Sequence, residues 1–262
     1  MNEFLSFAEQ VAREAGAILR ERFGAPLDVR RKGRIDLVTE VDVLAENLIR
    51  SRIQRRFPDH AILAEESGLV ERASAFRWII DPLDGTTNYS HGYPFFSVAI
   101  ALEQAGETVV GVVYDPLRDE LFAAARGQGT TCNGHPVRVS AVPTLEQALL
   151  VTGFPYNVRS SPRKNLDHFS AFLEIAQAIR RDGSAALDLA YVAMGRFDGF
   201  WELNLAPWDM AAGSLLVTEA GGRVTAFDGQ PFSPYVAEIV ASNGLLHDAM
   251  CEVLRASART SE

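Results

Sequence analysis

The chain opens with two stretches in which apolar residues recur at helical spacing. Over residues 4–22 every third or fourth position is apolar, which predicts an amphipathic helix that ends at Gly24. A second stripe follows Thr39, whose hydroxyl suits the N-cap of a helix, and it ends at Phe57, before a proline. The N-terminal part of the chain is therefore expected to carry two helices.

Strand patterns replace the helical pattern further along the chain. Short apolar runs at 61–64 and 78–80 predict buried strands. After residue 93, alternation and turn sequences predict an antiparallel meander with strands at 95–102, 108–114, 121–125 and, after an Asn133-Gly134 turn, 137–140. This half of the chain is thus expected to be α+β.

Strands and helices alternate from residue 149 onward. Strands are expected at 149–152, 197–203 and 239–241, and helices over 166–179 and 182–195 and from Asp209 and Leu245. That alternation is typical of a layered α/β unit. A boundary near Pro143 divides the chain into an α+β half, residues 1–143, and an α/β half, residues 144–262.

The composition limits the class of protein. The 262 residues are 47% hydrophobic and 23% charged, which is ordinary for a globular protein. No apolar run reaches the ~18 residues of a membrane span, so no membrane partner is expected. Cys132 and Cys251 form no disulfide framework, and the N-terminus is unlike a secretory signal, so a cytoplasmic location is expected. The formal charge of −9 argues against nonspecific nucleic-acid binding.

Two aspartates are the first candidates for chemistry. Asp81 and Asp84 lie three residues apart after the apolar run 78–80. Pro82 should stop the strand, because it has no N–H for the ladder, and Gly85 allows the tight turn that starts a helix. Carboxylates beside free N–H groups at a helix start suit a hard cation and phosphate oxygens. An isolated Asp-Gly pair would by itself indicate only a turn.

The segment around these aspartates resembles a signature of the inositol monophosphatase family. Asp81-Pro-Leu-Asp-Gly-Thr-Thr-Asn88 runs on into His91-Gly-Tyr-Pro-Phe-Phe-Ser-Val98, and a second signature is matched by Trp208-Asp209-Met-Ala-Ala-Gly213 and Glu219-Ala-Gly-Gly222. The similarity covers nearly the whole chain. It implies a layered α-β-α-β-α sandwich, similar to that of fructose-1,6-bisphosphatase. It also implies Mg²⁺-dependent hydrolysis of a sugar or polyol phosphate that lithium inhibits.

The resemblance further implies a metal site built at strand ends. Its ligands would be four carboxylates and one backbone carbonyl, from Glu65, Asp81, Asp84, Asp209 and Leu83. An all-oxygen set suits Mg²⁺, with two or three ions per site and Mn²⁺ as a substitute. Two of the acids also have a structural explanation, since Asp209 could cap a helix and Glu65 begins an acidic pair of the kind common on surfaces.

Water is the nucleophile in the mechanism that the resemblance implies. Glu65 and Thr86 would orient the water and help take its proton, two metals about 3.5–4 Å apart would assist, and no phospho-enzyme would form. Asp42 would lie just behind the ligands or bind a third metal, although an acid also suits the first turn of a helix. Lys32, in the basic run Arg30–Arg34, would contact the site from a loop.

The resemblance divides substrate recognition between the phosphate and the polyol. The N–H groups of Gly85 and Thr86, beside Asp84, would hold the phosphate. The segment Gly183-Ser184-Ala185 would pass close to the substrate hydroxyls, and Glu202 would bind a hydroxyl of inositol. These residues favour myo-inositol monophosphate. Relatives with similar motifs hydrolyse fructose 1,6-bisphosphate, histidinol phosphate or 3′-phosphoadenosine 5′-phosphate, and these stay open as alternatives.

Two macromolecular interactions also follow from the resemblance. It implies a homodimer. Bacterial members resemble this chain around Arg180 and Arg181, and some act with the transcription machinery, so these arginines could bind a transcription factor or RNA polymerase. A solvated helix face is the more ordinary explanation of such charges.

Overall fold

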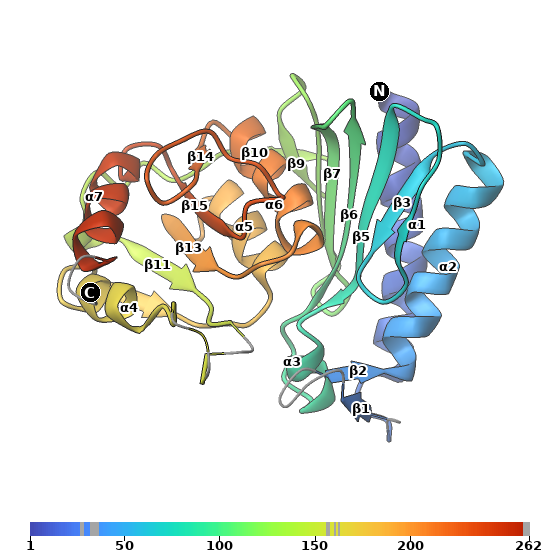
Figure 1. Ribbon diagram of the computed structural model, residues 1–262, viewed down its shortest axis with the longest axis horizontal. Coiled ribbons are helices and arrows are strands. Elements are labelled where there is room, and N and C mark those ends of the chain that lie inside the picture. Colours follow the sequence, from blue (N-terminus) through green and yellow to red (C-terminus); the bar gives the residue numbers. More distant parts are fainter. Residues whose placement is uncertain (27–28, 32–36, 156–157, 160, 162, 259–262) are drawn as a thin grey trace.

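A computed structural model describes the chain except for residues 27–28, 32–36, 156–157, 160, 162 and 259–262. Figure 1 shows five layers, in the order α2 with α1, a large sheet, α5 with α6, a smaller sheet, and α4 with α7. The described helices are α1 Asn2–Arg22, α2 Glu40–Arg56, α3 Thr86–Ser90, α4 Leu166–Leu173, α5 Ala185–Ala193, α6 Pro207–Glu219 and α7 His247–Ala258, with a 3₁₀ turn at Leu145–Gln147. The predicted α-β-α-β-α sandwich is confirmed. None of these helices is both long and apolar enough to cross a membrane.

The large sheet is antiparallel apart from one pair. Its strand order in the described residues is β10-β9-β8-β7-β6-β5-β3-β4, with β3 and β5 parallel. Its strands are β3 Ala61–Ala64, β4 Gly68–Val70, β5 Phe76–Asp84, β6 Ser97–Gln104, β7 Glu107–Asp115, β8 Glu120–Ala125, β9 Thr130–Cys132 and β10 His135–Val137. The predicted meander is confirmed in β6, β7 and β8. The strand predicted at 137–140 is wrong in its bounds, because β10 precedes it and ends at Val137.

Both faces of β5 are covered by helices. Trp78 and Ile80 pack into the core against α1 and α2, whereas Ile79 packs into the core around α5 and α6. Burial on both faces explains why this strand is an unbroken apolar run. Side chains two residues apart on a strand lie on the same face of the sheet. The side chain of Asp81 therefore points, like that of Ile79, toward the layer formed by α5 and α6.

Strand β5 continues through Pro82 to Asp84, so the prediction that it stops at the proline is wrong. Pairing with β6 is regular as far as Asp81 and shifts before Asp84. On the other side, β3 pairs with β5 only up to Ile80. Pro82 therefore lies at an irregularity of the ladder, which is where a strand tolerates a proline.

The smaller sheet is mixed, with the order β12-β11-β13-β15-β14 in the described residues. Its strands are β11 Leu149–Thr152, β12 Ala178–Arg180, β13 Gly199–Leu203, β14 Arg223–Thr225 and β15 Glu238–Ser242. Strand β11 runs parallel to β12 and β13, and the other pairs are antiparallel. A separate hairpin pairs β1 Val29–Arg31 with β2 Leu37–Thr39.

The helix predicted over residues 166–179 is wrong in its second half. Helix α4 ends at Leu173, and β12 follows at Ala178–Arg180. Ile175, Ala176 and Ile179 pack against the same outer core as α4. Apolar spacing alone did not distinguish a helix from a turn and an edge strand, because either arrangement buries these residues.

Candidate active site

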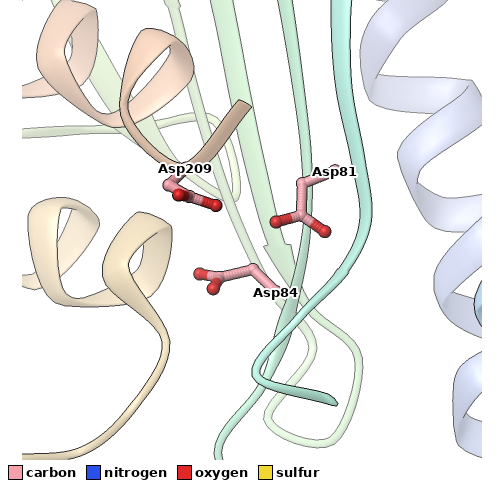
Figure 2. A group of neighbouring side chains, drawn as sticks. All are labelled: Asp81, Asp84 and Asp209. Carbon is pink, nitrogen blue, oxygen red and sulfur yellow. The ribbon is translucent and has the colours of Figure 1, made fainter. Parts of the chain in front are cut away.

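Three aspartates from two elements of different layers meet at the C-terminal end of β5. Asp81 and Asp84 come from the end of β5, and Asp209 comes from the first turn of α6 (Figure 2). One carboxylate oxygen from each lies within 4.8 Å of those of the other two. Each side chain is directed into the gap between β5 and α6, although Asp84 and Asp209 are 125 positions apart in the sequence.

Glu65 joins this cluster from the end of β3. Its N–H donates to the Ile80 carbonyl oxygen at 3.2 Å, which continues the β3–β5 pairing by one residue. Burial raises the pKa of Asp81 well above its usual value, and the charges of Glu65, Asp84 and Asp209 raise it further. A hydrogen bond with the Glu65 side chain also favours the protonated form of Asp81. The four acids therefore repel one another when all are ionised.

Asp84 is held by the N-terminus of α5. Its Oδ2 accepts hydrogen bonds from the Ser184 hydroxyl at 2.6 Å and from the Ala186 N–H at 2.8 Å. Burial raises the pKa of Asp84 to about 6, and these bonds oppose the rise. Ser184, predicted to face substrate hydroxyls, thus serves first to fix a carboxylate at a helix N-terminus, a favourable place for negative charge.

Asp42 positions Thr86. Its Oδ2 accepts from the Thr39 N–H at 2.8 Å and from the Thr39 hydroxyl at 2.5 Å, which confirms Thr39 as the N-cap of α2. The Thr86 hydroxyl lies 3.0 Å from both Asp42 Oδ1 and the Leu83 carbonyl oxygen, so its one hydrogen is shared between them. Asp42 is fully buried, and burial raises its pKa.

Asp209 is the third residue of α6 rather than its N-cap. The N-cap is Ala206, whose N–H donates to Asp209 Oδ2 at 2.7 Å. Burial raises the pKa of Asp209 well above its usual value, and the negative charge of Asp84 adds to the rise. One oxygen of the carboxylate thus holds the helix start while the other faces the cluster.

A cavity of about 250 Å³ opens beside the cluster. Glu65, Asp84, Gly183, Ser184, Ala185, Glu202 and Asp209 line it, together with Thr87, Asn88, Gly153, Phe154, Pro155, Arg181, Asn204, Leu205, Ala206 and Trp208. Burial raises the pKa of Glu202 to about 8, as does the charge of Asp84. Arg181 is the cationic side chain among these lining residues. The structure therefore gathers the predicted polyol residues on the walls of one cavity.

The turn after Asp84 requires glycine. Gly85 has a φ of 99°, and a Cβ there would lie 3.1 Å from the Phe95 carbonyl oxygen and 3.2 Å from that of Gly183. Asn88, quoted in the sequence motif but given no role, donates from Nδ2 to the carbonyl oxygens of Phe95 and Asp182, each at 2.7 Å. It ties the Gly85 turn to the segment before α5. Lys32 lies outside the described residues.

The cluster suits a hard cation. Its donors are carboxylate oxygens, and the metal-ligand grouping found in the described residues contains no His or Cys. Within the described part of the chain, no ion pair compensates Asp81, Asp84 or Asp209. Oxygen-only sites of this kind favour Mg²⁺, Mn²⁺ or Ca²⁺ over zinc.

The chain is similar to known proteins along nearly its whole length. The model of the inositol monophosphatase family matches residues 1–259. An inositol-1-monophosphatase of Synechocystis is 45% identical over 259 residues, covering 98% of this chain and 90% of that protein. The Nus factor SuhB of Escherichia coli K12 is 43% identical over 258 residues, covering 97% of each.

Solved structures show the same fold. The inositol monophosphatase of Anabaena has a TM-score of 0.89 and 44% identity, covering 97% of this chain and 96% of that one. SaIMPase-II, solved with inositol monophosphate bound, has a TM-score of 0.81 and 25% identity, covering 98% of this chain and 96% of that one.

Proposed function

Since the chain belongs to the inositol monophosphatase family, whose members are phosphatases, we propose that it hydrolyses the phosphate monoester of a small polyol. Myo-inositol monophosphate is the first candidate substrate. The observation that carries the proposal is the meeting of Asp81, Asp84 and Asp209 beside a small cavity that Glu202 also lines.

We propose Mg²⁺ as the cation, with Mn²⁺ as a substitute. Glu65, Asp81, Asp84, Asp209 and the Leu83 carbonyl would hold two ions. Bound there, they would supply Lewis acidity toward the phosphate and toward water. Because the carboxylate of Asp42 is occupied by Thr39 and Thr86, we assign it to positioning Thr86 rather than to a third ion.

The chain's own groups orient the reactants. Glu65, on the cavity wall, accepts the proton of the attacking water, and the Thr86 hydroxyl, fixed by Asp42 and Leu83, orients that water. The N–H groups of Gly85 and Thr86 hold phosphate oxygens so that attack is in line. The water oxygen bonds to phosphorus as the ester P–O bond breaks, which releases the alcohol and inorganic phosphate without a phospho-enzyme.

Three properties of the cavity favour a polyol monophosphate. Its volume of about 250 Å³ is below the ~300–1,000 Å³ usual for drug-sized ligands, which disfavours a nucleotide. Glu202 can accept hydrogen bonds from hydroxyls, and in its ionised form it would repel a second phosphate. Among the lining residues, Arg181 alone is cationic, whereas a bisphosphate would need more compensating charge. Histidinol phosphate stays a competitor, because Glu202 could also bind its amine.

The test is phosphate release from four substrates, with and without Mg²⁺: inositol 1-phosphate, fructose 1,6-bisphosphate, histidinol phosphate and 3′-phosphoadenosine 5′-phosphate. We expect release to require the cation and to be fastest from inositol 1-phosphate. A higher kcat/KM for either bisphosphate would contradict the substrate class. Full activity after exhaustive chelation would contradict the role of the cation.

A second candidate function is binding to the transcription machinery. It is suggested by relatives that carry the name Nus factor SuhB. Arg180 is exposed at the edge strand β12, whereas the neighbouring Arg181 lines the cavity, so changing both at once would mix binding with catalysis. Capture of RNA polymerase from extract should be compared for wild type, Arg180→Ala and Arg181→Ala. No capture by the wild type would remove this candidate.

Three further proposals rest on family membership alone. We propose that the protein is a cytoplasmic homodimer and that Li⁺ inhibits it. Light scattering at micromolar concentration tests the oligomeric state, fractionation of the source cells tests the location, and a Li⁺ titration of phosphate release tests the inhibition. A monomer in solution, or activity insensitive to Li⁺, would contradict the corresponding proposal.

A further inference from the structure

We propose that Gly153 determines substrate choice, because the space of its missing side chain is occupied by the Glu202 carboxylate. The proposal rests on the function proposed above, in which that carboxylate binds a substrate hydroxyl. Gly153 directly follows β11, and Glu202 lies on the neighbouring strand β13, one residue beyond the pair Thr152 and Trp201. Both residues line the cavity.

A side chain at position 153 and the carboxylate cannot occupy the same space. A Cβ at Gly153 would lie well under 3.0 Å from Oε1, Oε2 and Cδ of Glu202, closer than real Cβ atoms approach other groups. The backbone of Gly153 is not among those with positive φ, so its conformation does not itself call for glycine. The requirement for glycine comes from the carboxylate.

The two backbones are fixed relative to each other by buried polar groups. Asn165 donates from Nδ2 to the Gly153 carbonyl oxygen at 2.6 Å and to the Thr152 hydroxyl at 2.9 Å. Its Oδ1 accepts from Trp201 Nε1 at 2.8 Å. The Thr152 hydroxyl donates to the Trp201 carbonyl oxygen at 2.5 Å. Shifting either strand would break these bonds in a buried setting, where unpaired polar groups are costly.

The Glu202 carboxylate is the group that can move. Among the described residues, no hydrogen bond holds its oxygens, and it faces the cavity. A methyl group at position 153 would therefore displace the carboxylate and leave the strands in place. The enzyme would keep its phosphate site but lose the interaction with the polyol.

The experiment compares wild type, Gly153→Ala, Glu202→Ala and the double variant at saturating Mg²⁺. The readout is the ratio of kcat/KM for inositol 1-phosphate to that for phenyl phosphate, which has no hydroxyl for Glu202. Loss of the hydrogen bond to the ionised form of Glu202 predicts a fall of about 10- to 100-fold in this ratio for Gly153→Ala. The double variant should fall no further than Glu202→Ala, because each change removes the same interaction.

Gly199→Ala is the matched control. It lies on β13, and its Cβ would lie 2.5 Å from Met250 Sδ and 2.8 Å from Met250 Cε, in the outer core. It should lower the melting temperature without changing the substrate ratio. If Gly153→Ala fails to fold, the double variant should fold, since removing the carboxylate frees the space. A double variant that also fails to fold would overturn the proposal.

The remaining outcomes separate this proposal from the proposed function. A ratio that falls for Glu202→Ala but not for a folded Gly153→Ala overturns the role of Gly153 and leaves the function standing. If the two changes lower the ratio independently, so that their effects multiply in the double variant, the role of Gly153 is overturned as well. A ratio unchanged by Glu202→Ala overturns the polyol role of Glu202, and with it the role of Gly153.

Discussion

Asp84 meets two opposing demands, because a cation needs its charge whereas the protein without a cation must bury that charge. It is 8% exposed, and burial raises its pKa to about 6. In Asp84→Asn the amide oxygen can still accept from Ser184 and Ala186, but it offers a cation no charge. We expect phosphate release at saturating Mg²⁺ to fall at least ~10²-fold, the loss of several kcal/mol of charge stabilisation.

The stability of the same variant provides the control. Without metal, the change from carboxylate to amide removes one member of a repelling acid cluster, so the melting temperature in chelator should hold or rise. Thermal melts in chelator and in Mg²⁺ check this beside the phosphate assay. Near-wild-type activity with a lower melting temperature in chelator would mean that Asp84 is only a structural partner of α5.

His247 is a buried base that makes stability depend on pH. Its Nε2 lies 2.9 Å from the Thr225 hydroxyl and its Nδ1 3.0 Å from the Ser242 hydroxyl. Burial lowers its pKa to about 4 from an ordinary 6.5, and the charge of Arg223 adds to this. The unfolded chain therefore binds the proton more readily between pH 6.5 and 4. The free energy of unfolding should fall as pH drops through this window, by on the order of 3 kcal/mol.

His247→Gln keeps an amide at the place of Nε2, near the Thr225 hydroxyl, but does not titrate. In urea unfolding with chelator at pH 7, 6, 5 and 4.5, the variant should lose about 2–3 kcal/mol less than wild type over this range. His60 and His168, whose pKa values burial also lowers, are present in both proteins and cancel in the comparison. Parallel pH profiles would refute the assignment.

The N-terminus of α5 is the element that orients Asp84. The Ser184 hydroxyl is buried and donates to Asp84 at 2.6 Å. Ser184→Ala removes a hydrogen bond to a charged group, an effect of about 1.5–3 kcal/mol. If that bond preorganises the ligand, the Mg²⁺ concentration for half-maximal activity should rise about tenfold or more, with activity largely restored at saturation.

Ser97→Ala is the control for that change. The Ser97 hydroxyl lies 3.3 Å from the Ser184 hydroxyl and, among the described residues, makes no hydrogen bond with Asp84. It should shift the Mg²⁺ requirement little. A Ser184→Ala enzyme with unchanged Mg²⁺ requirement but reduced maximal activity would place Ser184 on the substrate instead.

Elements with a clear apolar pattern over four or more residues could be predicted from the sequence, and strands of three residues could not. Helix α2 with its Thr39 cap, strand β3 and strand β11 lie where the pattern placed them. The three-residue strands β1, β4 and β14 span too few positions for a period to show. Pro82 misled the prediction because its tolerance depends on a bulge, which is a property of strand pairing and not of local sequence.

The sequence singled out the acids of the candidate site but not the contacts that support them. The acids stand out at strand and helix ends, and the resemblance grouped them. The hydrogen bond from Ser184 to Asp84 joins residues 100 positions apart in the sequence. Gly153 and Glu202 come together only because β11 and β13 pair. Contacts of this range follow from tertiary packing, so no window of sequence contains them.

At the scale of the whole molecule, both parts of the chain, on either side of the boundary predicted near Pro143, contribute acids to one cluster. Asp81 and Asp84 come from residues 1–143, and Asp209 comes from residues 144–262. Asn88 also joins the two parts, through its hydrogen bond to the Asp182 carbonyl. The acids repel one another when no cation is present, so cation binding should add to the hydrophobic packing that joins the two parts of the chain.

We therefore expect Mg²⁺ to stabilise the folded protein by mass action. At a concentration 100 times the dissociation constant, the free energy of unfolding should rise by about 2.7 kcal/mol, since the unfolded chain does not assemble the site.

Asp209→Asn should start from an equal or higher melting temperature in chelator, because it removes a repelling charge contributed by the second half. The rise in its melting temperature on adding Mg²⁺ should be smaller than that of the wild type, because the cation then bridges the halves less well. Thermal melts across a Mg²⁺ titration measure both effects, and Glu219→Gln, whose carboxylate accepts from Gly127 and Gly129 away from the site, is the control. If Mg²⁺ raised the melting temperatures of wild type and Asp209→Asn equally, the cation would be held by the first half alone.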